Sequence, residues 1–184
     1  MRTLVLSPIK AFTLGLLALS FFTVGARADS AGGLEWTAPA GWENQRRPMR
    51  AANYLIPGAS GGESGELAVY YFGPGQGGSV EMNVKRWIGQ FRAPDGGPAD
   101  ALAKRTDEKV GDISVTLIDL RGTYLFKPFP MAPKAQEKPG YRMLAAIAQG
   151  ADAPVFFKLT APEKTAAAAE AKFQAVIDSL RKSP

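Results

Sequence analysis

The spacing of hydrophobic and polar residues changes along the chain, and each spacing predicts a different element. Apolar and polar residues alternate through residues 113–126, ISVTLIDLRGTYLF, which predicts the longest strand of the protein. Gly122 lies inside this run and predicts either a bulge or the close approach of another backbone. Shorter runs with side chains typical of strands cover residues 34–37, 50–56, 66–72, 104–110, 141–149 and 154–160.

A helical spacing follows a glycine-rich stretch in the middle of the chain. Four glycines and a proline in residues 73–78 predict a loop, and Ser79 is the expected N-cap of the helix. The apolar stripe of this helix has the spacing i, i+4, i+7, i+8 and i+11 and consists of Val80, Val84, Trp87, Ile88 and Phe91. The pattern therefore predicts a helix with one buried face over residues 80–91.

A second helix is predicted at the end of the chain. Thr160 and Glu163 have the spacing of a capping box, so we expect the helix to begin there. An alanine run at 166–169 favours helix strongly. The expected buried face consists of Phe173, Val176, Ile177 and Leu180.

Prolines and glycines mark the connections between these elements. Residues 127–140, KPFPMAPKAQEKPG, contain four prolines and predict an extended, partly polyproline loop. Residues 150–153 are expected to connect two strands as a hairpin. Residues 29–33 are polar or small and predict a loose segment. Hairpins combined with two amphipathic helices predict an α+β layer fold with a mostly antiparallel sheet.

The first 28 residues have the features of a secretory signal peptide. An uncharged, mostly apolar run covers residues 11–25, and Ala26-Arg27-Ala28 matches a cleavage site. We therefore expect a periplasmic or secreted protein with one α+β domain over residues 29–184. No membrane span is expected after cleavage, because the run is shorter than the roughly 20 residues that a span requires. Retention of this segment as an anchor is the alternative.

Removal of the signal peptide would change the charge balance. Arg2, Lys10 and Arg27 all lie in that segment, which contains no acidic residue. Taking these three from the 22 basic residues leaves 19 against 17 acidic residues, a net charge of +2. No basic run is longer than the two residues of Arg46-Arg47, so the composition does not predict a nucleic-acid partner.

The chain contains no histidine and no cysteine. This excludes serine–histidine–acid triads, cysteine–histidine pairs and zinc sites of the HExxH type. An enzyme would have to use carboxylates, lysine, tyrosine or serine, or a hard metal held by oxygen atoms. We expect no cofactor, and the sequence places no metal ligand.

Several of these runs together resemble the Mog1/PsbP-like superfamily, including uncharacterised exported bacterial members. The segments that carry the resemblance are WTAPAGW at 36–42, MRAANYLIP at 49–57, NVKRWIGQF at 83–91 and FFKLTAP at 156–162. The resemblance covers roughly residues 34–180 and implies an α/β/α sandwich with an antiparallel central sheet. It implies no activity, because the superfamily includes a small-GTPase-binding protein and a photosystem subunit. A secreted protein would not meet a cytosolic GTPase, and no manganese or calcium ligand can be carried over.

An exported domain without the usual catalytic side chains predicts a non-enzymatic binding or assembly module of the bacterial cell envelope. We expect a protein partner, and the oligomeric state is left open. The candidate binding residues are Arg50, Asn83, Arg86, Trp87 and Gln90. The alternative is an ordinary structural role for each: Trp87 in the core, Arg86 over apolar surface, and the two amides in solvent.

Two other functions are kept as alternatives. A carboxylate-dependent hydrolase could draw on Glu63, Glu66, Glu81, Asp95, Asp100, Asp107, Asp112 and Asp119. Asp119 has apolar neighbours in its strand, where burial would raise its pKa, although exposure on an edge strand is the other possibility. A small-molecule carrier would need a pocket between the sheet and the middle helix, lined by Tyr70, Phe72, Trp87 and Phe91.

Overall fold

The computed structural model of the protein describes residues 28–129 and 132–183. Of the predicted signal peptide, only Ala28 falls within these ranges. None of the helices in the described ranges is both long and apolar enough to span a membrane. Two single turns of 3-10 helix, η1 (Ala59–Gly61) and η2 (Asp100–Leu102), interrupt the connections between the main elements.

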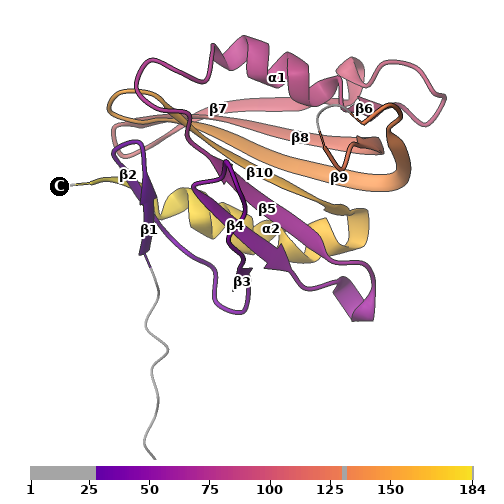
Figure 1. The fold of residues 1–184 in the computed structure, drawn as a ribbon, viewed down its shortest axis with the longest axis horizontal. Helices are drawn as coiled ribbons and strands as arrows, with labels where there is room; N and C mark the ends of the chain where they lie inside the picture. Colours follow the sequence, from indigo (N-terminus) through magenta and orange to yellow (C-terminus); the bar gives the residue numbers. More distant parts are fainter. Residues whose placement is uncertain (1–27, 130–131, 184) are drawn as a thin grey trace, which may run out of the picture.

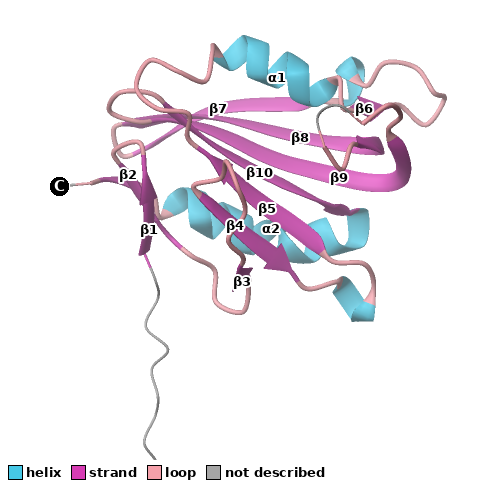
Figure 2. Cartoon of the chain, in the orientation of Figure 1, coloured by secondary structure: helices cyan, strands magenta, loops and turns pink. Residues whose placement is uncertain are grey.

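An eight-stranded antiparallel sheet forms the central layer of the fold (Figures 1 and 2). Its strands run in the order β3 (Glu43–Asn44), β4 (Ala52–Ile56), β5 (Gly65–Tyr70), β10 (Pro154–Pro162), β9 (Gln136–Gln149) and β8 (Ile113–Phe126). On the far side of β8, its two ends pair separately with β7 (Lys104–Val110) and β6 (Phe91–Arg92). The central strands β10 and β9 are consecutive in sequence, as the predicted hairpin at 150–153 requires.

The two helices pack on opposite faces of this sheet (Figure 1). On one face, α1 (Val80–Ile88) contributes Val84 and Trp87 to a core with residues of β8, β9 and β10. On the other face, α2 (Glu163–Asp178) buries Phe173, Val176 and Ile177 against the same strands. The fold is therefore an α+β sandwich of helix, antiparallel sheet and helix, as predicted.

A small second sheet joins the two ends of the described chain. It consists of β1 (Ala28–Ala31), β2 (Leu34–Thr37) and β11 (Arg181–Lys182). The prediction of a loose segment at residues 29–33 is therefore wrong. Gly32 and Gly33 both adopt positive φ angles, 59° and 73°, and make the tight turn that pairs β1 with β2.

The proline-rich connection is shorter than predicted, because β9 begins at Gln136 and takes in Pro139. The register of β8 and β9 shifts between Gly122 and Tyr124, opposite Pro139 and Gly140. A bulge leaves ladder positions unpaired, so a proline is tolerated there. The expectation for Gly122 is confirmed: an added Cβ would lie 2.5 Å from the carbonyl oxygen of Arg92 in β6.

The predicted start of the C-terminal helix is wrong. Thr160 belongs to β10 and pairs with Glu66 and Met143, and α2 begins only after Pro162, without a side-chain cap. A proline suits this position because its φ angle is preset and its missing N–H is not needed. Ser79 does cap α1 as predicted, and its Oγ accepts a hydrogen bond from the Met82 N–H at 3.2 Å. That helix ends at Ile88, three residues earlier than expected, because Phe91 enters β6.

Candidate functional site

A buried lysine lies in the middle of the sheet, on the face that α1 covers only in part. Lys158 is in the central strand β10, and its neighbours across the ladder are Ala68 and Ala145. Small neighbours leave room for a long side chain to lie along the sheet, and only 9% of Lys158 is exposed. Its Nζ donates a hydrogen bond to Oε1 of Gln90 and lies 5.3 Å from the centre of the Tyr124 ring.

The surroundings of Lys158 disfavour its charge. Burial lowers its pKa to about 8, the carboxylate of Glu66 opposes this change, and the guanidinium groups of Arg86 and Arg50 add to it. The acceptor at Gln90 is a neutral amide. Among the described residues, no ion pair joins Lys158 to a carboxylate.

Arg50 lies beside this lysine on the open part of the sheet. Its Nη1 forms an ion pair with Oε2 of Glu66 at 2.8 Å and donates to Oδ1 of the buried Asn53. Its Cζ lies 5.6 Å from the centre of the Tyr70 ring, a cation–π arrangement. The Arg50 side chain is 21% exposed, so part of the guanidinium group remains open to solvent.

Arg86 is positioned by Asn83 within α1. The buried Asn83 donates from Nδ2 to the carbonyl oxygens of Gly77 and Ser79, at 2.7 and 2.8 Å. Its Oδ1 accepts a hydrogen bond from Nη2 of Arg86 at 2.6 Å. Asn83 therefore fastens the glycine-rich loop to the helix and at the same time orients an exposed arginine.

Trp87 does not reach the surface of the molecule. It is 3% exposed and meets the Phe156 ring edge-on, with ring centres 6.2 Å apart. Its large ring anchors α1 to the sheet, which is the core role named as the alternative.

Of the five predicted residues, Arg50, Arg86 and Gln90 thus lie around one buried lysine. The full group, called the Lys158 face below, comprises Arg50, Glu66, Tyr70, Arg86, Gln90, Tyr124 and Lys158. Lys158, Glu66 and Tyr124 were not among the predicted binding residues. The sequence PVFFKLT contained one sign of this site, because a lone lysine interrupts an otherwise apolar strand.

The aromatic part of this face continues towards the β8–β9 bulge. The rings of Tyr124 and Tyr141 stack with centres 5.9 Å apart. Oε1 of Glu63 accepts hydrogen bonds from Nζ of Lys138 and from the Tyr141 hydroxyl, both at 2.6 Å. These two hydrogen bonds lower the pKa of Glu63. The ammonium group of Lys138 thus favours the charged form of the Glu63 carboxylate.

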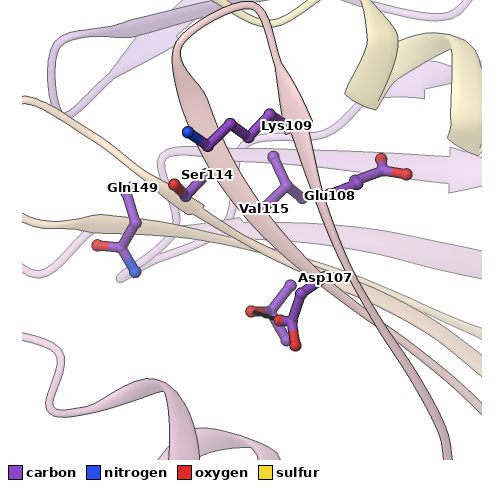
Figure 3. Close-up of a pocket in the computed structure, with 7 residues that line it drawn as sticks. Asp107, Glu108, Lys109, Ser114, Val115 and Gln149 are labelled. Carbon is purple, nitrogen blue, oxygen red and sulfur yellow. Dashed lines mark hydrogen bonds between the residues drawn. The ribbon is translucent and has the colours of Figure 1, made fainter.

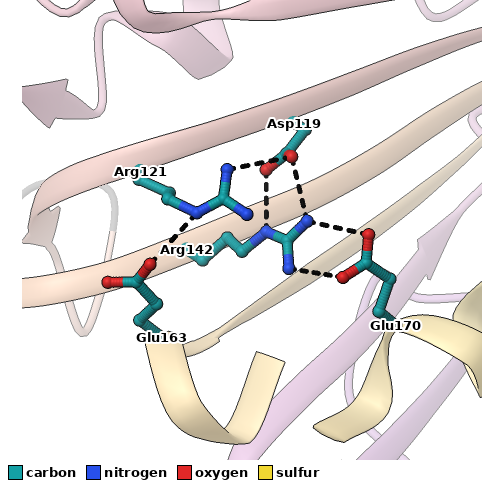
Figure 4. Close-up of polar contacts among 5 residues, drawn as sticks. All are labelled: Asp119, Arg121, Arg142, Glu163 and Glu170. Carbon is teal, nitrogen blue, oxygen red and sulfur yellow. Dashed lines mark hydrogen bonds and ion pairs between the residues drawn. The ribbon is translucent and has the colours of Figure 1, made fainter. Parts of the chain in front are cut away.

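Asp119 belongs to an ion-pair network on the opposite face of the sheet (Figure 4). The buried Arg142 donates to both carboxylate oxygens of Asp119, at 2.8 and 2.9 Å, and to both oxygens of Glu170 in α2, at 2.7 and 2.9 Å. Arg121 adds contacts of 3.1 Å to Asp119 and to Glu163.

Neither alternative for Asp119 is correct: β8 is paired on both sides at this residue, so Asp119 does not lie on an edge strand, and its pKa is not raised. Burial by itself would raise it, but the hydrogen bonds and charge of Arg142, with a contribution from Arg121, lower the pKa overall. Arg142 also lies between the Asp119 and Glu170 carboxylates and forms an ion pair with each. This network ties β8, β9 and α2 together.

Two surface hollows lie away from the Lys158 face. One, of about 300 Å³, is at the β7–β8 hairpin and is lined by Asp107, Glu108, Lys109, Ser114, Val115, Thr116 and Gln149 (Figure 3). The other, of about 570 Å³, lies between the end of α1 and the loop at 96–100. Of the four residues expected to line a carrier pocket, Phe91 lines the second hollow, whereas Tyr70, Phe72 and Trp87 line neither.

The acidic residues of the described ranges are dispersed. Within the described ranges, no three or more acidic side chains are arranged so that they could hold a metal ion. Asp107, at the first hollow, accepts a hydrogen bond from Thr116 Oγ1 at 2.6 Å and pairs with Arg105 at 3.1 Å. The hydrogen bond from Thr116, followed by that from Arg105, lowers the pKa of Asp107.

Comparisons with known proteins support the fold. No family model matches the chain, and no curated protein matches its sequence. The solution structure of cyanobacterial PsbP (CyanoP) from Synechocystis sp. PCC 6803 is similar over 91% of this chain and 99% of its own, at 13% identity and a TM-score of 0.52. PA94 from Pseudomonas aeruginosa, described as a protein of unknown function and a candidate regulator, is similar over 86% and 98%, at 11% identity and a TM-score of 0.51.

Proposed function

We propose that this chain, with its Mog1/PsbP-like fold, is an exported, non-enzymatic binding or assembly module of the bacterial cell envelope. In this proposal the Lys158 face contacts a protein partner, and no nucleic acid or cofactor takes part. The predicted signal peptide and the absence of histidine and cysteine support the proposal from the sequence.

The proposal rests on the hydrogen-bond acceptors that the cations of this face contact. Elsewhere in the described chain many basic side chains pair with carboxylates, as Arg105, Arg121 and Arg142 do. Lys158 and Arg86 instead donate to neutral amides. A buried cation without a carboxylate lowers the stability of the fold. A cost of this kind, next to an exposed arginine and half-buried tyrosines, is characteristic of surfaces that bind a partner.

The geometry gives less support to a carboxylate-dependent hydrolase. A general acid at neutral pH requires a raised pKa, usually through burial or a neighbouring negative charge. The pKa values of Asp119, Glu63 and Asp107 are instead lowered by hydrogen bonds from basic or hydroxyl groups.

The proposal is tested by exchanging one cation of the face. Arg86→Ala removes an exposed guanidinium group, and Lys85→Ala, the adjacent exposed cation of α1, is the matched control. The tagged, mature chain is cross-linked in the envelope of its own host, and partner recovery is quantified for each variant. We expect Arg86→Ala to lower recovery, and Lys85→Ala to leave it unchanged. Lys85→Ala should change the free energy of unfolding by less than about 0.5 kcal/mol. Arg86→Ala also removes the donor to Oδ1 of the buried Asn83, so urea denaturation of both variants accompanies the recovery measurement.

Gln90→Ala is not suited to this test, because it would remove the hydrogen-bond acceptor of a buried ammonium group. Arg50→Ala is the second test variant, since Arg50 lies on the other side of Lys158. Undiminished recovery of the same partner by both the Arg50 and the Arg86 variants would show that the Lys158 face is not the binding surface.

A further inference from the structure

We propose that the Lys158 face binds the carboxylate groups of an acidic peptide segment that also carries apolar side chains. This inference rests on the proposed function and adds the chemical class of the bound segment. It follows from the charge of the face, from the types of donor it offers and from the exposed apolar residues beside it.

The face has more positive than negative charge. Its three cations are Arg50, Arg86 and Lys158, and its carboxylate is Glu66. Glu66 is already paired with Arg50 at 2.8 Å, which leaves an excess of two positive charges. The two cations without a carboxylate come from different layers of the fold, Arg86 from α1 and Lys158 from strand β10 of the sheet. An anion placed between them would compensate both.

The donors match a carboxylate. A guanidinium group offers two parallel N–H bonds in a plane, which fits the two oxygens of a carboxylate. Tyr70 and Tyr124 border the cations with their rings, at 5.6 Å from Arg50 and 5.3 Å from Lys158. Such rings reduce contact with water, and electrostatic attraction is stronger where water is excluded.

Exposed apolar side chains lie next to these cations. Phe72 is 42% exposed and stacks on Tyr70 with ring centres 6.0 Å apart. Met49, the residue before Arg50, is 85% exposed and adopts φ = 59°, a left-handed conformation that is rare outside glycine. Strained backbone of this kind concentrates at binding sites. Apolar contacts beside a basic face favour a peptide over a free inorganic anion.

The test uses the mature chain labelled with 15N and a short synthetic peptide rich in glutamate that carries one phenylalanine. The matched peptide replaces every glutamate by glutamine. We expect the glutamate peptide to shift the amide resonances of Arg50, Tyr70, Arg86 and Gln90, and the glutamine peptide to bind at least roughly tenfold more weakly.

Three variants locate the interaction. Arg86→Gln should weaken binding of the glutamate peptide roughly tenfold, because it removes a charge-assisted hydrogen bond. Arg50→Gln should also weaken it, because it leaves the Glu66 carboxylate on this face without its paired cation. Arg105→Gln removes the same charge from β7, where the arginine is paired with Glu81 and Asp107, and should leave the affinity unchanged. Equal weakening by all three variants would mean that only net charge matters, and would overturn the inference.

Two further outcomes would also overturn it. Equal affinity for the glutamate and glutamine peptides would indicate apolar docking. Binding to vesicles of anionic lipid that depends on Arg50 and Arg86, without binding to the peptide, would assign the face to a membrane surface.

The envelope experiment separates this inference from the proposed function. If Arg86→Ala releases a partner in the envelope while the glutamate peptide fails to bind, the face binds a protein by other chemistry. In that case the present inference fails and the proposed function stands. If the peptide fails and partner recovery is also unaffected, both are wrong.

Discussion

At the scale of single residues, the burial of Lys158 is the feature that sets this protein apart from an ordinary sandwich. Most buried positions of β10 are apolar, such as Phe156, Phe157 and Leu159. A lysine among them must lose part of its hydration, and a single amide at Gln90 replaces only part of it. The residue therefore costs stability in the isolated chain.

This cost should depend on pH. The pKa of Lys158 is lowered by burial from 10.5 to about 8 in the folded chain, whereas the unfolded chain keeps the ordinary value. Between these values the unfolded state binds more protons, so the contribution of Lys158 to stability rises with pH. Below about pH 8 the lysine is charged in both the folded and the unfolded chain, so the buried charge lowers the stability of the fold by its full amount.

We therefore expect the wild-type chain to gain stability relative to Lys158→Met as pH rises from about 7.5 to 9.5, by roughly 1 kcal/mol or more. Urea denaturation of both proteins at several pH values measures the difference. The comparison cancels the effects of Tyr70 and Tyr124, whose pKa values burial raises in both chains. A difference in stability that is constant with pH would contradict the assignment of Lys158 as a buried ammonium group.

At the scale of elements, the sequence pattern predicted the strands whose side chains alternate and missed those that depend on tertiary structure. Strand β8 has the predicted bounds, because apolar and polar residues alternate along it and most of its apolar side chains are buried or half-buried. The sequence pattern did not predict the first part of β9, because Pro139 favours a loop. The strand tolerates this proline only because of the bulge between β8 and β9, which the pattern does not reveal. Strand β1 was missed, because ADSA has no strand preference before β2 pairs with it.

The ion-pair network around Arg142 gives a test of how these elements are joined. Arg142 is 3% exposed and binds Asp119 of β8 and Glu170 of α2, whose side chains are 24% and 53% exposed. We expect Arg142→Ala to lower the free energy of unfolding by about 2 kcal/mol, less than for a fully buried pair. Arg121→Ala should cost less than about 1 kcal/mol, because that side chain is 43% exposed.

Urea denaturation of the two single variants measures this difference. Equal losses for Arg142→Ala and Arg121→Ala would show that the network is a surface feature and does not tie α2 to the sheet. The pKa shift of Asp119 gives an independent check. Because its pKa is lowered in the folded state, the stability it contributes is present at neutral pH and is lost as pH falls through that pKa.

At the scale of the whole molecule, the sandwich explains why only part of the candidate site was predictable. Arg86 and Gln90 lie in the predicted helix but outside its apolar stripe, and Arg50 is the first residue of a predicted strand, so their exposure could be inferred. Their convergence on Lys158 depends on the order β4-β5-β10, in which the late strand β10 pairs with the early strand β5, which in turn pairs with β4. Spacing along the sequence does not specify that order.

The export prediction also belongs to this scale. Cleavage after Ala28 would remove one residue of β1 and leave Asp29 to pair with Trp36 in β2. We expect the chain expressed in its host to be recovered from the periplasm or medium with Asp29 as its first residue. Intact-mass measurement after fractionation tests this. Recovery of the full-length mass from the membrane fraction would instead show that the segment is retained as an anchor.

The small sheet that joins β1, β2 and β11 has a consequence for synthesis. Strand β2 receives its last partner only when Arg181 and Lys182 arrive, and Arg181 then pairs with Glu35 at 2.7 Å. The core is likewise incomplete until the residues of α2 are available. A nascent chain therefore cannot complete its fold before residues 163–182 have been synthesised, and its earlier part remains only partly folded up to that point.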